Sequence, residues 1–149
     1  MALRDELTQL YNRRGFFFAA EQYLLHARRA KERALLFFFD IDGLKIINDT
    51  QGHCAGDVLI RDAGDVLKRS FREEDIVARL GGDEFIALAI DATNSQAVLR
   101  RISHELQRSK VSFSSGVTVF DPTSADTLET MIQRADANMY MQKRDRKAV

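Results

Sequence analysis

The chain contains little of what would indicate an extracellular or nucleic-acid-binding protein. Its 149 residues include one cysteine, one proline and no tryptophan, and 22 Lys and Arg balance 22 Asp and Glu to a formal net charge of zero. A single cysteine cannot form an internal disulfide, so we expect Cys54 to be an inert, buried thiol in a reducing compartment. A neutral chain lacks the overall basic field that holds a nucleic-acid polymer. We therefore expect a cytoplasmic domain that meets any anionic ligand with local groups.

Long hydrophobic runs are absent as well. No apolar run is longer than the six residues 34–39, which is far shorter than the roughly 20 residues that cross a bilayer. Residues 1–14 mix charged and apolar side chains, unlike a signal peptide. The three histidines, His26, His53 and His104, are widely spaced and form no H-E-x-x-H motif. These absences argue against direct membrane insertion and against a zinc hydrolase.

What is present is enough apolar material for one compact domain. Hydrophobic residues make up 45% of the chain and charged residues 30%, and this length falls in the commonest size range of single domains. The sequence has no internal repeat, low-complexity stretch or Pro/Ser-rich linker. We expect a single domain over residues 1–149, a module of a longer, regulated protein.

Apolar periodicity predicts alternating helices and strands. Asn12 is placed to cap the first helix, and paired glycines at Gly81 and Gly82 predict a tight hairpin. The order favours an α/β chain, an α+β sandwich of the ferredoxin-like kind with helices covering a mostly antiparallel central sheet. The expected helices are residues 13–31, 44–50, 56–71, 95–107 and a last one after Pro122, and the expected strands are 34–41, 76–80, 84–90 and 111–120.

Carboxylates stand where these strands meet turns. Asp40 and Asp42 close the apolar run at residues 34–41, and Asp83 and Glu84 follow the paired glycines. Mg²⁺ takes oxygen ligands and often uses one or two protein carboxylates together with substrate phosphates. An antiparallel pairing would place the second pair of carboxylates beside Asp40, as in the palm of nucleotidyl-transferring enzymes. The alternative is a set of solvated turn residues.

The segment that follows could bind a nucleotide. Backbone amides around Gly43 could cradle phosphates, with Lys45 as a point charge on them. Asn48 and Asp57 could bind the edge of a guanine and reject adenine, which would leave their polar groups unpaired. Each residue also has an ordinary interpretation, as a surface lysine, an Asn in a helix turn and an Asp near a helix start.

Several ordered motifs resemble the GGDEF domains, the diguanylate cyclases. Asp5 to Arg14 resembles the opening D-x-L-T-x-L-x-N-R-R pattern of that family, and the resemblance extends over essentially the whole chain. The other segments that carry it are residues 40–49 (DIDGLKIIND), Gly52-His53, Gly56-Asp57, residues 81–85 (GGDEF), Ala135-Asp136, Tyr140 and Lys143.

The resemblance implies that two GTP molecules condense into cyclic di-GMP with release of two pyrophosphates. Each domain of a homodimer would hold one GTP, with Mg²⁺ or Mn²⁺ as cofactor. By position, Asp40, Asp83 and Glu84 and the carbonyl of Ile41 would hold metal ions. Asp83 or Glu84 would assist deprotonation of the 3′-hydroxyl, and the resemblance leaves the choice between them open.

The resemblance also assigns the groups that bind GTP. Lys45 would be catalytic, stabilising charge on the phosphates with help from Lys143. Guanine would be bound by Asn48 and Asp57. His53 would contact or support the nucleotide, and Gly82 completes the set of substrate-binding residues.

A second binding site is implied upstream of the hairpin. Arg72 and Asp75 have the spacing of the family's inhibitory R-x-x-D site for cyclic di-GMP, in which Arg contacts the acceptor edge of a guanine and Asp its donors. Without the resemblance, such a pair would be an exposed ion pair of small energetic consequence.

Some positions depart from the family pattern. Leu44 stands where Phe is commoner, a shortened sheet edge is expected before the strand at 111–120, and the second basic phosphate contact would fall to Lys147.

Two hypotheses about function therefore remain. The chain is an active cyclase coupled to a sensor or regulatory domain, or it is a catalytically weak module that binds GTP or cyclic di-GMP and regulates a partner domain.

Overall fold

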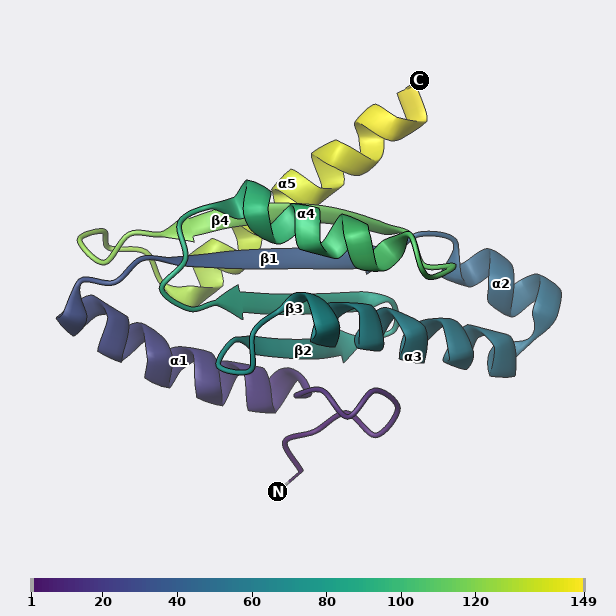
Figure 1. The fold of residues 1–149 in the computed structure, drawn as a ribbon, viewed down its shortest axis with the longest axis horizontal. Helices are drawn as coiled ribbons and strands as arrows, with labels where there is room; N and C mark the ends of the chain where they lie inside the picture. The colour runs from purple at the N-terminus through teal and green to yellow at the C-terminus, as the bar shows by residue number, and fades with distance from the viewer. Residues whose placement is uncertain (1, 149) are drawn as a thin grey trace.

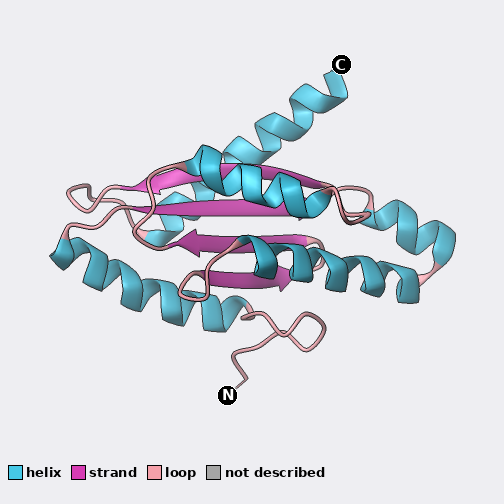
Figure 2. Ribbon diagram, in the orientation of Figure 1, coloured by secondary structure: helices cyan, strands magenta, loops and turns pink. Residues whose placement is uncertain are grey.

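A computed structural model describes residues 2–148 of the chain, and the side chains of residues 2–146. The described part forms one four-stranded antiparallel sheet with helices on both faces (Figures 1 and 2). The spatial order of the strands is β2-β3-β1-β4. Along the chain the elements are α1 (Arg13–Ala30), β1 (Ala34–Ile41), α2 (Leu44–Gln51), α3 (His53–Ser70), β2 (Ile76–Gly81), β3 (Glu84–Ala89), α4 (Ser95–Leu106), β4 (Phe113–Phe120) and α5 (Leu128–Ala148).

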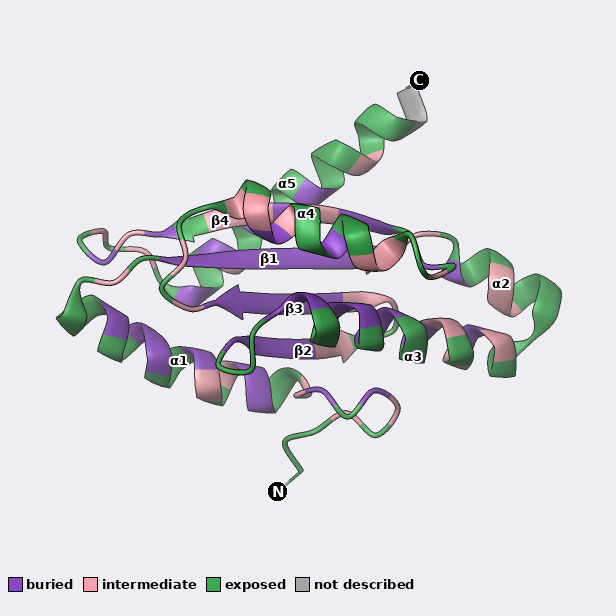
Figure 3. Ribbon diagram, viewed as in Figure 1, coloured by how far each residue is buried: buried purple, intermediate pink, exposed green. Residues whose placement is uncertain are grey.

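Strand β1 is buried along its whole length because it lies inside the sheet and both of its faces are covered. Phe37 and Phe39 face the core formed with α3 and α4, whereas Leu36 and Phe38 face the core formed with α1 and α5. This alternation follows from the two-residue repeat of a strand, and Figure 3 shows the resulting buried layer between the helices. The predicted α+β sandwich and the bounds of this central strand are confirmed.

Local signals explain most element boundaries. The Asn12 side chain accepts a hydrogen bond from the Gly15 backbone N–H at 2.8 Å, so the predicted cap of α1 is confirmed. The expectation that α3 starts at residue 56 is wrong, because a single residue, Gly52 at φ +90°, separates it from α2. The helix therefore starts at His53, three residues earlier than predicted. Strand β4 starts at Phe113, two residues later than predicted.

The N-terminal segment is tied to the β2–β3 hairpin. The Asp5 carboxylate accepts hydrogen bonds from the backbone N–H and the hydroxyl of Thr8. It also forms an ion pair with Arg79 at 3.1 Å. Tyr11 forms a parallel bridge with Ala78, so this segment covers the outer edge of β2. The opening motif thus helps to fix the hairpin that carries Asp83.

One expectation about a single side chain is wrong. Cys54 is exposed rather than buried, because it lies on the outward side of the first turn of α3. At the end of α1, Arg28 donates to the carbonyl of Asp126 at 2.9 Å and lies over the ring of Phe120 at 5.2 Å. In the described part of the chain, no helix is long and apolar enough to cross a membrane.

Candidate active site

The sheet brings the two groups of carboxylates together. Asp40 at the end of β1 pairs directly with Glu84 at the start of β3, and the backbone N–H of Ile41 donates to the carbonyl of Asp83 at 2.9 Å. Directly opposed residues of an antiparallel pair have Cβ atoms about 4.5–5.5 Å apart. The predicted antiparallel pairing, which places the hairpin carboxylates beside Asp40, is confirmed.

Asp40 is a nearly buried carboxylate with one oxygen paired and the other free. Only 8% of the residue is exposed. Its Oδ2 accepts an ion pair from Lys143 of α5, and its Oδ1 is buried with no hydrogen-bond partner among the described residues. The hydrogen bond to Asp40 raises the pKa of Lys143. A buried carboxylate oxygen without a partner is costly, so this atom is a position where a cation would be stabilised.

The hairpin carboxylates are held at unusual pKa values. Burial, followed by the neighbouring Asp40 carboxylate, raises the pKa of Asp83 to about 6. Burial, followed by the charges of Asp136 and Asp40, raises the pKa of Glu84. Like charges and low solvation both oppose ionisation. The end of the sheet therefore concentrates negative charge that Lys143 and Arg13 only partly balance.

These carboxylates fit a magnesium-type site that a ligand completes. Among residues 2–146, no group of three or more His, Cys, Asp or Glu side chains is placed to hold a metal ion. Mg²⁺ usually takes only one or two protein carboxylates and fills its remaining positions with water and phosphate oxygens. The unpartnered Oδ1 of Asp40 and the adjacent Asp83 meet that smaller requirement.

Asp42 has a different environment from Asp40, although the sequence places both at the same strand end. Its carboxylate accepts hydrogen bonds from Ser112 at 2.8 Å and Ser114 at 2.7 Å, and an ion pair from Arg146 at 2.9 Å. All its partners are therefore protein groups. Asp42 joins the ends of β1, β4 and α5 and leaves Asp40 as the unsaturated carboxylate. No local sequence pattern indicated that Ser112, Ser114 and Arg146 would contact Asp42.

Helices α2 and α3 carry the residues expected to bind the nucleotide. Gly43, at φ +78°, lets the chain turn from β1 into α2. The Asn48 side chain lies against Gly56, where an added Cβ would be 1.8 Å from its Oδ1. Asp57 follows Gly56 directly, so α2 and α3 bring the two predicted guanine-binding residues to the same junction.

Four side chains of α2 and α3 have no hydrogen-bond or ion-pair partner in the described part of the chain, and are available to a ligand. They are Lys45, Asn48, His53 and Asp57. Lys143, by contrast, is already engaged with Asp40. The Lys147 side chain, the expected second phosphate contact, lies outside the described residues.

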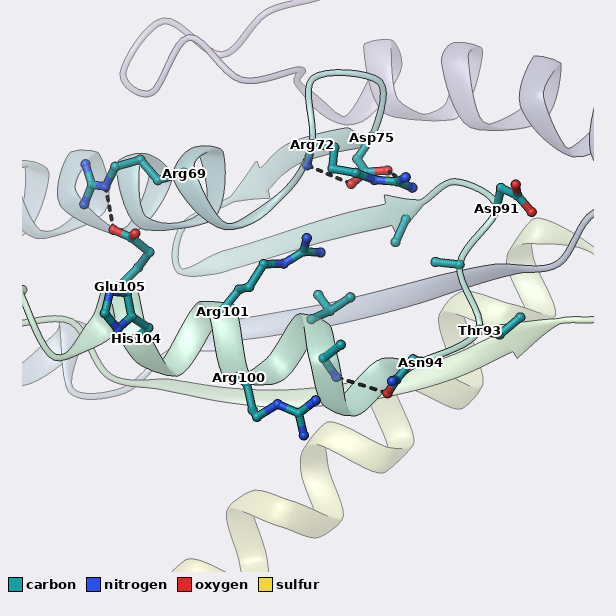
Figure 4. Close-up of a pocket in the computed structure, with 14 residues that line it drawn as sticks. Arg69, Arg72, Asp75, Asp91, Thr93, Asn94, Arg100, Arg101, His104 and Glu105 are labelled. Atoms are coloured by element: carbon teal, nitrogen blue, oxygen red, sulfur yellow. Dashed lines mark hydrogen bonds and ion pairs between the residues drawn. The ribbon is translucent and has the colours of Figure 1, made fainter.

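The R-x-x-D pair lies in a separate pocket of about 620 Å³ between α3 and α4 (Figure 4). The Asp75 carboxylate is fully buried and accepts the backbone N–H groups of Arg72 at 2.8 Å and Ile90 at 2.9 Å. Arg72 donates to the carbonyl of Ile90 and remains partly exposed. Asp75 thus points at the backbone, and Arg72 presents the accessible face of the pair.

Sequence reasoning missed other basic side chains of this pocket. Arg100, Arg101 and His104 of α4 line it, and Figure 4 shows Arg101 pointing from the helix toward Arg72 and Asp75. The basic side of α4 was the available signal, since it was visible in the sequence of residues 100–104.

Comparison with known proteins places this geometry in a family. The family described as "Diguanylate cyclase, GGDEF domain" matches residues 2–148. The chain belongs to the GGDEF domain family. The resemblance seen in the sequence is confirmed, and the Gly-Gly-Asp-Glu-Phe motif of this GGDEF domain is the β2–β3 hairpin described above.

Curated relatives are longer proteins. The GGDEF domain is 36% identical to the bifunctional diguanylate cyclase/cyclic di-GMP phosphodiesterase MucR of Pseudomonas aeruginosa, over 96% of this chain and 22% of that protein. It is 32% identical to the probable diguanylate cyclase DgcJ of Escherichia coli, over 97% of this chain and 30% of that protein. The chain thus spans less than a third of the length of either relative.

Solved structures share the whole architecture. The GGDEF domain of DgcB from Caulobacter crescentus, in complex with c-di-GMP, is 29% identical and superposes with a TM-score of 0.89, covering 97% of this chain and 92% of that one. The GGDEF domain of TpbB from Pseudomonas aeruginosa is 34% identical with a TM-score of 0.85, covering 95% and 89%. The four-stranded sheet with its flanking helices is therefore the family's fold.

Proposed function

We propose that this GGDEF domain is a diguanylate cyclase that condenses two GTP molecules into cyclic di-GMP. The observation that carries the proposal is the register of β1 against β3, which sets Asp40 opposite Glu84 and beside Asp83. A nucleotidyl transferase needs such a concentration of carboxylates where a 3′-hydroxyl meets an α-phosphate.

Asp40, Asp83 and Glu84, with the carbonyl of Ile41, are the groups that would hold Mg²⁺ or Mn²⁺. The buried, unpartnered Oδ1 of Asp40 supports this assignment. When bound, the metal supplies Lewis-acid stabilisation of the phosphate oxygens and of the attacking hydroxyl.

The remaining steps belong to the chain's own groups. Asp83 or Glu84 accepts the 3′-hydroxyl proton, and burial, which raises the pKa of both carboxyls in the metal-free chain, favours proton uptake by either. The freed oxygen forms a bond to the α-phosphorus of the second GTP while the bond to pyrophosphate breaks. A second, identical attack closes the ring. Lys45 and Lys143 balance the charge of the phosphates.

Recognition of guanine falls to the α2–α3 junction. The Asp57 carboxylate can accept the ring N–H and amino group of guanine, and the Asn48 amide can serve its carbonyl oxygen. His53 and Gly82 complete the nucleotide site. Adenine would leave Asp57 facing an acceptor, so the proposal predicts selection of GTP over ATP.

Two further features belong to the proposal. The ring has two bonds to close, so two domains face each other as a homodimer, each with one GTP. The product cyclic di-GMP binds in the pocket that contains Arg72 and inhibits the enzyme. Arg72 contacts an acceptor edge of guanine, as in bidentate Arg–guanine pairs. Asp75 fixes the loop around Arg72 by accepting the backbone N–H groups of Arg72 and Ile90. A sensor or regulatory domain of a longer protein would set the activity.

The test is nucleotide chromatography of the chain with GTP and Mg²⁺ or Mn²⁺, beside an Asp83→Asn control and an ATP control. We expect cyclic di-GMP and pyrophosphate in a 1:2 ratio from the native chain, and neither from Asp83→Asn or from ATP. Binding of GTP or cyclic di-GMP without product at any protein concentration would overturn the cyclase proposal in favour of the receptor alternative.

A further inference from the structure

Strand β4 is an edge strand whose outer backbone is covered by side chains instead of another strand. Among the described residues it pairs only with β1, at the end of the order β2-β3-β1-β4. The outer N–H and C=O groups of such a strand need partners other than a strand. In this molecule helix α5 lies alongside it, on the side seen behind β4 in Figure 1.

Three side chains of α5, spaced four residues apart, bond to alternate residues of that edge. Asn138 Nδ2 donates to the carbonyl of Val117 at 3.0 Å, and the Ser115 backbone N–H donates to Gln142 Oε1 at 2.7 Å. Arg146 Nη1 donates to the carbonyl of Phe113 at 3.1 Å. Four helical residues rise about 6 Å and two strand residues about 7 Å, so the two repeats match. We call Asn138, Gln142 and Arg146 the edge ladder.

The close approach of α5 to β4 depends on Gly116. A Cβ at this position would lie 2.0 Å from the carbonyl oxygen of Ala135 and 2.4 Å from the backbone nitrogen of Met139. Backbone therefore lies against backbone at this crossing. Only because no side chain separates them can short side chains such as Asn138 reach the strand edge.

Beyond Met139, polar side-chain contacts tie the described part of α5 to the sheet. Met139 is buried, but the residues at 140–146 are exposed, apart from the half-buried Lys143. The contacts that hold this stretch are those of Gln142 and Arg146 with β4, of Arg146 with Asp42, and of Lys143 with Asp40. The position of the Lys143 ammonium is therefore set by the residues around it on the helix.

We propose that Asn138 and Gln142 are positioning residues of the active site, which hold α5 on the edge of β4 so that Lys143 stays beside Asp40. This inference rests on the proposed function only for the role of Lys143 toward the phosphates of GTP. Arg146 contributes a second fixed point through Asp42. The edge ladder thus has two effects: it covers the exposed edge of β4, and it holds the Lys143 ammonium beside Asp40.

The test compares an Asn138→Ala/Gln142→Ala variant with Gln133→Ala, a matched control on the same helix. Gln133 is exposed and has no partner in the described part of the chain. We expect the double variant to bind a fluorescent GTP analogue in EDTA three- to tenfold more weakly, and to raise KM for GTP more than it lowers kcat. Amide hydrogen exchange should accelerate at Ser115 and across residues 140–146, while Gln133→Ala behaves as the native chain.

A Lys143→Ala background separates positioning from general weakening of the helix. If the edge ladder acts through Lys143, adding Asn138→Ala/Gln142→Ala to Lys143→Ala should not weaken GTP binding further. Additive losses, or unchanged GTP affinity in the Asn138→Ala/Gln142→Ala variant, would overturn the proposal. Absence of cyclic di-GMP from the native chain would count against the proposed function alone, since nucleotide binding and exchange would still report on the ladder.

Discussion

At the scale of single residues, the active site depends on unequal treatment of two similar carboxylates. Asp42 is saturated by Ser112, Ser114 and Arg146, whereas one buried oxygen of Asp40 has no partner among the residues that the structure describes. A buried polar group without a hydrogen-bond partner is destabilising. The environment of Asp40 therefore favours the binding of a cation. Asp83 lies beside Asp40, and its pKa is raised by burial and by that neighbouring carboxylate.

That raised pKa predicts a pH dependence of stability. Asp83 titrates near 6 in the folded chain and near 3.8 when unfolded, so the folded state binds the proton more tightly. The stabilising contribution is complete below about pH 4 and is lost as pH rises through about 6. Its upper bound is about 3 kcal/mol, which solvent screening of this half-exposed group reduces to about 1 kcal/mol.

Urea unfolding in EDTA between pH 4.5 and 7.5 measures this contribution. Asn mimics the protonated carboxyl and does not titrate, so Asp83→Asn should gain about 1 kcal/mol over the native chain as pH rises across this range. Asp65→Asn, a change at an exposed aspartate of α3, is the control. A constant difference between native chain and Asp83→Asn at all pH values would contradict the raised pKa.

At the scale of elements, a substitution at the contact between α2 and α3 should weaken GTP binding without lowering the stability of the fold. Ala at position 56 would place its Cβ 1.8 Å from Asn48 Oδ1, but that oxygen ends a short, half-exposed side chain that can swing away. Ala is also a better helix former than Gly by up to about 1 kcal/mol. We expect Gly56→Ala to unfold no earlier than the native chain, yet to bind GTP about tenfold more weakly because Asn48 is displaced.

Thermal unfolding and GTP titration of Gly56→Ala, Asn48→Ala and the double variant test this expectation. In the Asn48→Ala background, Gly56→Ala should have no further effect on GTP affinity, because the displaced side chain is already gone. A tenfold loss that persists in that background would show that Gly56 acts through another group.

The elements also show how far the sequence could predict the fold. Strand β1 was predicted to the residue because an uninterrupted apolar run has one interpretation in a sheet covered on both faces. The start of α3 was missed because two glycines bracket the break, and only the backbone angles show that Gly52 alone makes it. The edge ladder was invisible because Asn138, Gln142 and Arg146 look like ordinary polar residues of a solvated helix face.

The candidate site, like the fold, was predictable where local sequence signals determine it. The pairing of the carboxylates follows from a hairpin and a neighbouring strand, both of which have local sequence signals. The contacts of Asp42 with Ser112 and Ser114, and that of Asp75 with Ile90, join segments distant in sequence. Local patterns carry no information about such contacts.

At the scale of the whole molecule, the carboxylate cluster of one domain can serve only one of the two bond-forming steps at a time. Ring closure needs two 3′-hydroxyls, each aligned with the α-phosphate of the other nucleotide, and such alignment comes from holding both GTP molecules in opposed sites. We therefore expect the rate per chain to rise in proportion to chain concentration until the dimer is fully formed, while GTP affinity stays constant.

Mixing native chain with an excess of Asp83→Asn tests the dimer more strictly than dilution. In a mixed dimer only one site retains Asp83, so one attack proceeds, one pyrophosphate leaves, and the product is a linear dinucleotide that still carries a triphosphate. We expect cyclic di-GMP to fall with the square of the native fraction while the linear product appears, both measured by nucleotide chromatography. An equal excess of Asp65→Asn should leave the cyclic product dominant. If the cyclic product falls only in proportion to the native fraction, each chain completes both attacks alone, and the opposed arrangement of two domains is wrong.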